Sequence, residues 1–417
     1  MSFRTLLPVA ALLFLGTITA VAQPPDAFQQ SITHPAIAYL DTRPEDPVAQ
    51  LNRQLAAGSV TLRQEPVSGY LRSLLEALDI PVESQMLVFS QGSLQGDDIS
   101  YTNPRAIYFN DTVSVGWVRG AGTLEVTAHD PRQGVMFYAI DQSASRPQAA
   151  RSRECLQCHL TWDTLGVPGL TVLSTAPMAN ARDYANGFTT DHRSPFAERW
   201  GGWFVTGDHG QARHMGNRAV TPADRAKATI RNPLAVLPSV EGQFDLKGYP
   251  TPYSDVVALL VFDHQTRMAN LLTRAGWEAR VAAREPQHAP RIAAAARDVV
   301  DYMLFGDEMP LPGRVSGTSG FAEQFAARGP RDSRGRSLRD FDLTRRIFKY
   351  PLSYMIYSPM FDALPATARD AIYTRLFAVL TGKETSEALG RLTPADRTAV
   401  LEILRETKKD LPPYFGS

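Results

Sequence analysis

The sequence predicts an α+β fold, with a β-rich N-terminal half, a segment that holds both cysteines, and a mostly helical C-terminal half. Three observations predict this. Short runs rich in β-branched and aromatic residues follow one another between residues 86 and 141, separated by Gly, Asp, Asn and Pro. From residue 253 onward, long segments carry apolar residues between Pro and Gly residues that mark helix ends. Both cysteines, Cys155 and Cys158, stand between these two regions.

The sequence of the N-terminal half predicts one early helix followed by an antiparallel meander. In 69–81 the apolar residues Leu71, Leu74, Leu75 and Leu78 have helical spacing, and Pro81 ends the helix. Short strands joined by turn residues are typical of a meander. The expected strands are 105–110, 113–120, 123–130 and 134–141, with 201–207 as a further strand.

The C-terminal half predicts four helices and an arginine-rich loop. A Ser or Asp residue can cap the first helix, and Thr393 followed by Pro394 can start the last one. The expected helices are 254–284, 290–306, 365–382 and 393–410. Between them, 328–346 is expected to be a solvated loop.

The first 22 residues predict a secretory signal peptide. Arg4 precedes an apolar run from Thr5 to Ala20, and Ala20-Val21-Ala22 supplies small residues for cleavage. The run is short for a membrane anchor and contains Pro8, and no other stretch approaches the roughly 18 apolar residues of a span. We therefore expect an exported, periplasmic protein with no integral membrane span after cleavage. The 43 basic and 43 acidic side chains balance, so we expect no nucleic-acid partner.

The only two cysteines form the motif Cys155-Leu-Gln-Cys158-His159. Cys-x-x-Cys-His is the attachment sequence of c-type haem, in which two thioethers hold the porphyrin and the histidine ligates the iron. We therefore expect one haem c, held covalently by Cys155 and Cys158, with His159 as the proximal iron ligand. Because export is where such attachment is completed in bacteria, the signal peptide agrees with this interpretation.

Two other uses of the cysteines are weaker. A thioredoxin-like dithiol follows a buried strand, whereas residues 143–154 are polar. A structural zinc site needs two further ligands, and the pair His209 and His214 lies too far along the chain for the usual spacing.

The ligand on the other face of the iron has several candidates. His264 and Met268 share one face of the helix 254–284. His214 and Met215 lie with His209 in a glycine-bearing loop, and Met178 follows the Pro168-Gly169 turn. Each of these residues could instead be a core side chain or a solvated loop residue. Arginine and tryptophan side chains near the motif could bind the haem propionates. They are Arg151, Arg153, Arg199, Trp200 and Trp203.

These motifs divide the chain into four regions. They are a signal peptide (1–22), a β-rich region with one early helix (23–150), a haem-attachment and distal-loop region (151–252) and a helical region (253–417).

Several blocks of the sequence resemble a group of secreted bacterial mono-haem proteins with a cytochrome c domain. The blocks are SQMLVFSQGSLQ, NPRAIYFND, ECLQCH, RWGGWFVTGDHGQARHMGN, FDHQTRMANLLTRA and SLRDFDLTRRIFKYPLSYMIY. The resemblance covers most of the mature chain and implies haem binding and electron transfer, without a substrate. The resemblance assigns a role only to Cys155, Cys158 and His159. The compact pattern of a simple cytochrome c domain is absent around the motif, so we do not expect that fold.

Three functions follow from a single haem. The first is one-electron transfer with a periplasmic redox partner, with a Met or His opposite His159. The second is a peroxidase-like oxidoreductase, with an open distal position and His209, His214 or His264 as acid and base. The third is a non-catalytic binding or sensory module that the haem stabilises. We expect electron transfer, with oxidoreductase activity as the alternative.

Overall fold

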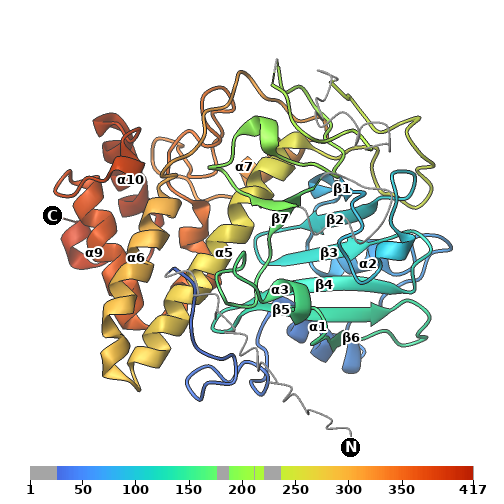
Figure 1. Ribbon diagram of the computed structural model, residues 1–417, viewed down its shortest axis with the longest axis horizontal. Coiled ribbons are helices and arrows are strands. Elements are labelled where there is room, and N and C mark those ends of the chain that lie inside the picture. Colours follow the sequence, from blue (N-terminus) through green and yellow to red (C-terminus); the bar gives the residue numbers. More distant parts are fainter. Residues whose placement is uncertain (1–25, 176–186, 211, 220–235, 417) are drawn as a thin grey trace, which may run out of the picture.

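The computed structural model describes residues 26–175, 187–210, 212–219 and 236–416. The predicted signal peptide and Met178 lie outside these residues. In Figure 1 a sheet with its short helices occupies one side of the molecule, and the long C-terminal helices occupy the other. This arrangement confirms the α+β class, with an antiparallel sheet in the N-terminal half and helices in the C-terminal half.

The main sheet is the predicted meander of four strands with one further strand added at each end. Its order is β1-β2-β3-β4-β5-β6, and all neighbours pair antiparallel. The turn residues between strands explain this topology, because short connections favour antiparallel neighbours. The strands are β1 (Met86–Val88), β2 (Arg105–Phe109), β3 (Val113–Trp117), β4 (Thr123–Asp130), β5 (Gly134–Asp141) and β6 (Ala149–Arg151).

The two faces of this sheet differ in character. One face carries apolar side chains that form a core with two early helices, α1 (Pro47–Ala56) and α2 (Leu71–Ala77). The sequence predicted α2 but not α1, which the Asp46 side chain caps by accepting from the N–H groups of Val48 and Ala49. The opposite face is lined with smaller and polar side chains, and it faces the helix α3 (Leu156–His159) and a small second sheet (Figure 1).

The second sheet contains only two strands, β7 (Val172–Ser174) and β8 (Phe188–Thr190), which the sequence did not predict. The expected strand at 201–207 was wrong. Gly202 has a φ of +87°, which turns the chain there, and within this segment only isolated bridges form, from Trp203 to Val88 of β1 and from Thr206 to Asp255.

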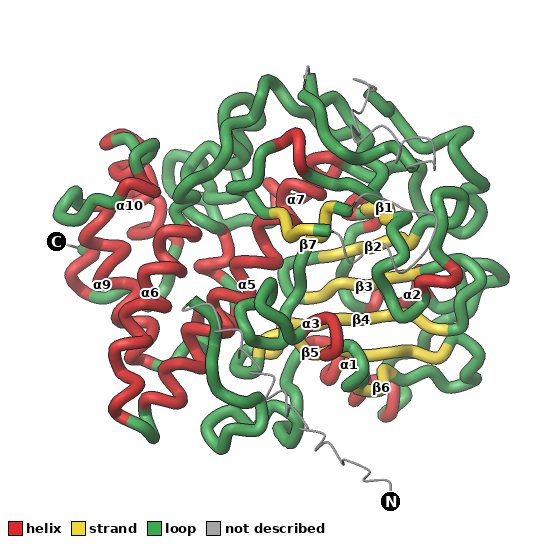
Figure 2. Tube along the Cα trace, in the orientation of Figure 1, coloured by secondary structure: helices red, strands yellow, loops and turns green. Residues whose placement is uncertain are grey.

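The C-terminal half is built around one buried helix, α5 (Val256–Ala282), which Asp255 caps. Its side chains are buried on almost every face, because the sheet lies on one side and α6 (Ala289–Met303) and α9 (Ala366–Leu380) lie on the other. A short connection joins α5 to α6, whereas long loops interrupted by short helices lie between α6 and α9 (Figure 2). The remaining helices are α7 (Phe321–Ala327), α8 (Pro359–Asp362) and α10 (Pro394–Thr407).

The four predicted C-terminal helices are confirmed as α5, α6, α9 and α10. The segment 328–346 is a loop as predicted, but several of its arginines form ion pairs within the chain, such as Arg336 with Asp332 at 2.6 Å and Arg346 with Asp396 at 2.6 Å. No helix among the described residues is both long and apolar enough to cross a membrane.

Candidate functional site

The motif forms a single helical turn. The backbone N–H groups of Cys158 and His159 both donate to the Cys155 carbonyl, at 3.2 and 3.0 Å. The Cys155 side chain is half-buried and the Cys158 side chain is exposed, and the two are not joined in a disulfide. Two thiols and an adjacent imidazole on one short turn form the donor set that haem attachment requires.

The imidazole of His159 is fixed by the loop that follows it. Its Nδ1 lies 3.0 Å from the Gly169 carbonyl oxygen, which can only accept, so Nδ1 carries the proton. The Gly169 N–H returns a hydrogen bond of 2.9 Å to the His159 carbonyl. A bond from Nδ1 to a carbonyl is the usual support of a metal-ligating histidine, because it leaves the unprotonated Nε2 for the metal.

Burial keeps this imidazole neutral. Burial lowers the pKa of His159, the hydrogen bond to Gly169 opposes that shift, and the charge of Arg105 lowers the pKa further. The ring of Phe137 on β5 lies 5.0 Å from the His159 ring, between centroids. His159 is therefore held as a neutral ring against the sheet, which is the protonation state that ligates iron.

The turn borders a cavity of about 390 Å³ between α3 and the polar face of the sheet. This volume is in the range of cofactor sites. Cys155, Cys158 and His159 all line it, so the cavity lies where an attached haem would have to be. The sheet supplies one wall, made by Arg105 and Ile107 of β2, Ser114 and Gly116 of β3, Glu125 and Thr127 of β4, and Phe137 of β5. Leu170, Leu173, Thr175, Trp203 and Phe262 supply apolar and hydroxyl groups around it.

An ion pair lies in the sheet wall of this cavity. The Arg105 guanidinium is 2.9 Å from the Glu125 carboxylate, and Ser93 donates to the same carboxylate at 3.0 Å. Burial raises the pKa of Glu125, but the Arg105 charge and the hydrogen bonds lower it, and the net pKa is below its usual value. Glu125 is therefore ionised near neutral pH.

These residues fit a haem. Arg105 Nε and the hydroxyl of the buried Thr175 have no hydrogen-bond partner among the described residues, and both side chains line the cavity. Buried polar groups of this kind point to a ligand that satisfies them. When bound, haem would be held by the sulfurs of Cys155 and Cys158 and by Nε2 of His159.

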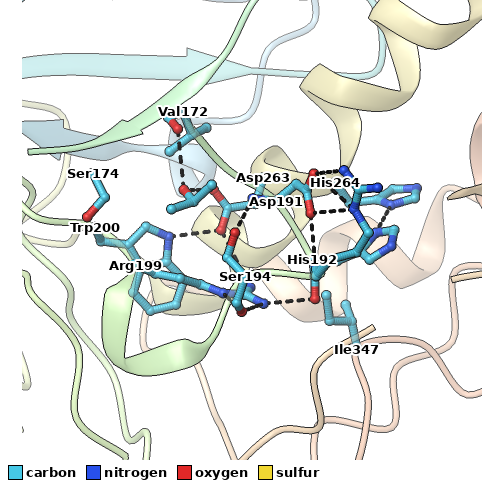
Figure 3. A network of polar contacts seen from close by, with 12 residues as sticks. Val172, Ser174, Asp191, His192, Ser194, Arg199, Trp200, Asp263, His264 and Ile347 are labelled. Atoms are coloured by element: carbon cyan, nitrogen blue, oxygen red, sulfur yellow. Dashed lines mark hydrogen bonds and ion pairs between the residues drawn. The ribbon is translucent and has the colours of Figure 1, made fainter. Parts of the chain in front are cut away.

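The distal candidate His264 belongs to a different part of the molecule. Its Nδ1 lies 2.9 Å from Nδ1 of His192, and its Nε2 lies 2.7 Å from the Ser353 hydroxyl. Figure 3 shows it within a buried polar network that includes Asp191, Asp263 and Arg199. Both ring nitrogens thus have partners, and His264 does not line the cavity.

The other distal candidates also lie outside the cavity lining. Met268 is fully buried in the core around α5. His214 packs against His209, with their Nε2 atoms 3.3 Å apart, and Met215 accepts from the Ser174 hydroxyl at 3.8 Å. Among the described lining residues there is no methionine, and His159 is the one imidazole.

Of the five predicted propionate donors, only Trp203 lines the cavity, and its indole N–H donates to the Leu173 carbonyl at 2.8 Å. Arg199 and Trp200 are fully buried beside Asp263. Arg151 donates to the Tyr39 carbonyl at 2.6 Å, and Arg153 is exposed.

The two competing uses of the cysteines gain no support. Among the described residues, no three His, Cys, Asp or Glu side chains converge on a point where a metal ion could bind. Burial raises the pKa of the Cys155 thiol, whereas a reactive dithiol needs a lowered one.

Arg105 and Glu125 were missed from the sequence. The available signal was Gly116 in the middle of a strand, because such a glycine often marks a close approach of another group. A Cβ at Gly116 would lie 2.7 Å from Arg105 Nε, so the missing side chain lets Arg105 cross β3 and reach Glu125 on β4.

Comparison with known proteins adds no family, since no protein-family model, curated protein or solved structure matches this chain.

Proposed function

We propose that this chain is an exported c-type haem protein that transfers single electrons through one covalently bound haem. The observation that carries the proposal is the bond from His159 Nδ1 to the Gly169 carbonyl, made beside a cavity that the two cysteines also line. A thiol pair alone would not need its neighbouring imidazole to be held in one tautomer. The haem iron supplies the chemistry, because it exists in two oxidation states that differ by one electron.

Different residues of the chain would attach such a haem, ligate its iron and cover it. Cys155 and Cys158 would form the thioethers, and His159 would ligate the iron from one face. Phe137 packs against the His159 ring and restricts its rotation. The cavity walls would cover part of the porphyrin and leave an edge near the exposed Cys158 for a periplasmic redox partner.

The attachment is tested by expressing the full chain in a host that matures c-type cytochromes. We expect covalent haem staining in a denaturing gel, one haem per chain in the pyridine haemochrome spectrum, and a mature N-terminus after Ala22. Cys158→Ala should lose most of the stain. Gln157→Ala lies in the same turn and keeps both cysteines, so it should keep the stain. A colourless wild-type protein with an intrachain disulfide would refute the proposal.

A peroxidase-like haem oxidoreductase is the second candidate, and the ion pair of Arg105 and Glu125 in the cavity wall favours it. Charged groups beside a haem can stabilise polar ligands, which a simple electron carrier does not require. Adding carbon monoxide to the reduced protein separates the two functions. An unchanged low-spin spectrum supports electron transfer, and a shifted spectrum supports the oxidoreductase.

A further inference from the structure

The ion pair between Arg105 and Glu125 stands out on the sheet wall because of where it is placed. The two side chains come from β2 and β4, and they meet above Gly116 of the intervening strand. Each is only about a fifth exposed, at 21% and 22%. Their neighbours on the same wall are small or uncharged, namely Ile107, Ser114, Thr127 and Phe137. The pair is thus the only charged feature of this wall among the described residues.

A contribution to stability does not by itself explain why an ion pair stands at this place. An ion pair removed from water costs about as much in lost hydration as it gains, and an apolar pair of similar volume would hold the strands at least as well. Arg105 also keeps Nε without a partner among the described residues. The pair therefore places a guanidinium and an ionised carboxylate, both still partly exposed, in the lining of the cavity.

We propose that Arg105 and Glu125 bind a small protic ligand, of the general form H–X, at the haem. The class includes hydrogen peroxide and hydrogen cyanide. The H–X bond breaks with its electron pair left on X, the proton passes to the Glu125 carboxylate, and the Arg105 guanidinium donates hydrogen bonds to the anion. This inference rests on the proposed haem attachment, and it gives the second candidate function a defined ligand class.

A haem propionate is the competing partner for Arg105, and the neighbouring carboxylate argues against it. A propionate would bring a second negative charge beside Glu125, which already neutralises the guanidinium at 2.9 Å. A protic ligand avoids this repulsion because it arrives neutral and gives its proton to the carboxylate. Arg105, Glu125 and His159 line the same cavity, so the pair faces the space beside the predicted iron ligand.

The experiment titrates the oxidised haem-loaded protein with sodium cyanide and with sodium fluoride near neutral pH, following the Soret band. Cyanide arrives there mainly as the protonated acid, whereas fluoride arrives as the bare anion. Arg105→Leu should weaken the binding of both by roughly ten- to a hundredfold, the effect of losing a charged hydrogen bond. Glu125→Gln should slow cyanide association at least tenfold, the lower range of proton-transfer effects, without weakening fluoride.

The controls separate this role from folding. Arg346→Leu removes an arginine of nearly the same exposure, 22% against 21%, that pairs with Asp396 at 2.6 Å outside the cavity lining, and this variant should bind both ligands like wild type. If Arg105→Leu does not fold, the same titrations are made with Arg105→Lys, which keeps the positive charge.

Several results would overturn the inference. They are wild-type haem that binds neither ligand, variants that bind both ligands like wild type, and an Arg105→Leu variant that loses haem or shifts potential with ligand affinity unchanged. The last result would assign Arg105 to a propionate. Absence of haem from the wild type would instead refute the proposed function itself.

Discussion

Nδ1 of His159 lies 3.0 Å from the Gly169 carbonyl oxygen, and the two residues return a second hydrogen bond of 2.9 Å between their backbones. The buried helix α5 supports this arrangement through one of its polar side chains. Asn270 of α5 donates to the Leu170 carbonyl at 2.8 Å and accepts from its N–H at 3.2 Å. The orientation of the histidine therefore depends on a side chain more than a hundred residues away in the sequence.

The first prediction concerns Gly169→Ala. A Cβ at this position would lie 2.1 Å from Asn270 Oδ1, so the alanine must displace either Asn270 or the carbonyl that holds His159. We expect a loss of about 1–3 kcal/mol in the free energy of unfolding, together with a shift in the visible spectrum of the haem protein. Urea unfolding and absorption measure the two effects. Gly313→Ala, where a Cβ would meet nothing within 4 Å, should change neither. A Gly169→Ala protein with wild-type stability would show that the loop can yield freely.

The second prediction concerns His264, which the sequence proposed as a distal ligand. Both of its ring nitrogens have protein partners, His192 and Ser353, and it lies outside the cavity lining. We expect His264→Gln to lower the free energy of unfolding by about 1–3 kcal/mol, because buried partners lose their hydrogen bonds. The spin state of the haem should stay as in wild type. A change from low spin to high spin in this variant would show that His264 ligates the iron in the wild-type protein.

Much of the fold could be predicted from the sequence because its signals are local. The four C-terminal helices begin and end at Pro, Gly and capping residues, and the meander strands are separated by turn residues. The short strands β1, β6, β7 and β8 contain three residues each and show no clear alternation, so they depend on tertiary pairing. The expected strand at 201–207 was wrong because its apolar residues pack into the core without a continuous ladder.

The candidate site likewise has one part that the sequence predicts and another part that it does not. Cys155, Cys158 and His159 are adjacent in the sequence, so their spacing alone indicates their chemistry. Arg105 and Glu125 come together only through the strand register, in which Gly116 lies opposite both Ile107 and Glu125. A single sequence does not give that register, and it also does not show that the polar face of the sheet is covered by α3 rather than by water.

The third prediction is a loss of stability in mild acid. Burial lowers the pKa of His129, in β4, to about 4, against an ordinary value of 6.5. Since the unfolded chain binds the proton first, this histidine's contribution is complete above about pH 6.5 and is lost as the pH falls towards 4. Each unit by which the pH falls in that window lowers the free energy of unfolding by about 1.4 kcal/mol. Between about pH 7 and 5.5, His129→Leu should therefore lose about 1 kcal/mol less than wild type in urea unfolding.

The control for this measurement is Thr123→Ala in the same strand, since it removes no titratable group. This variant should show the wild-type loss of stability between the two pH values. Equal losses in wild type and His129→Leu would show that His129 is protonated in the folded protein, against the effect of its burial.

The last prediction concerns Gly116→Ala, which tests whether the missing side chain in β3 is what brings Arg105 and Glu125 together. The new Cβ would lie 2.7 Å from Arg105 Nε and must push the guanidinium away from the carboxylate. We expect a loss of about 1–3 kcal/mol in the free energy of unfolding, typical of overpacking. In an Arg105→Leu background the same alanine should cost at least 0.5 kcal/mol less, a coupling typical of contacting residues. Urea unfolding of the four proteins gives this difference, and Gly122→Ala, with open space around its Cβ, is the matched control. Additive losses would mean that Arg105 does not need Gly116 to reach Glu125, because the alanine would then act on the strand itself.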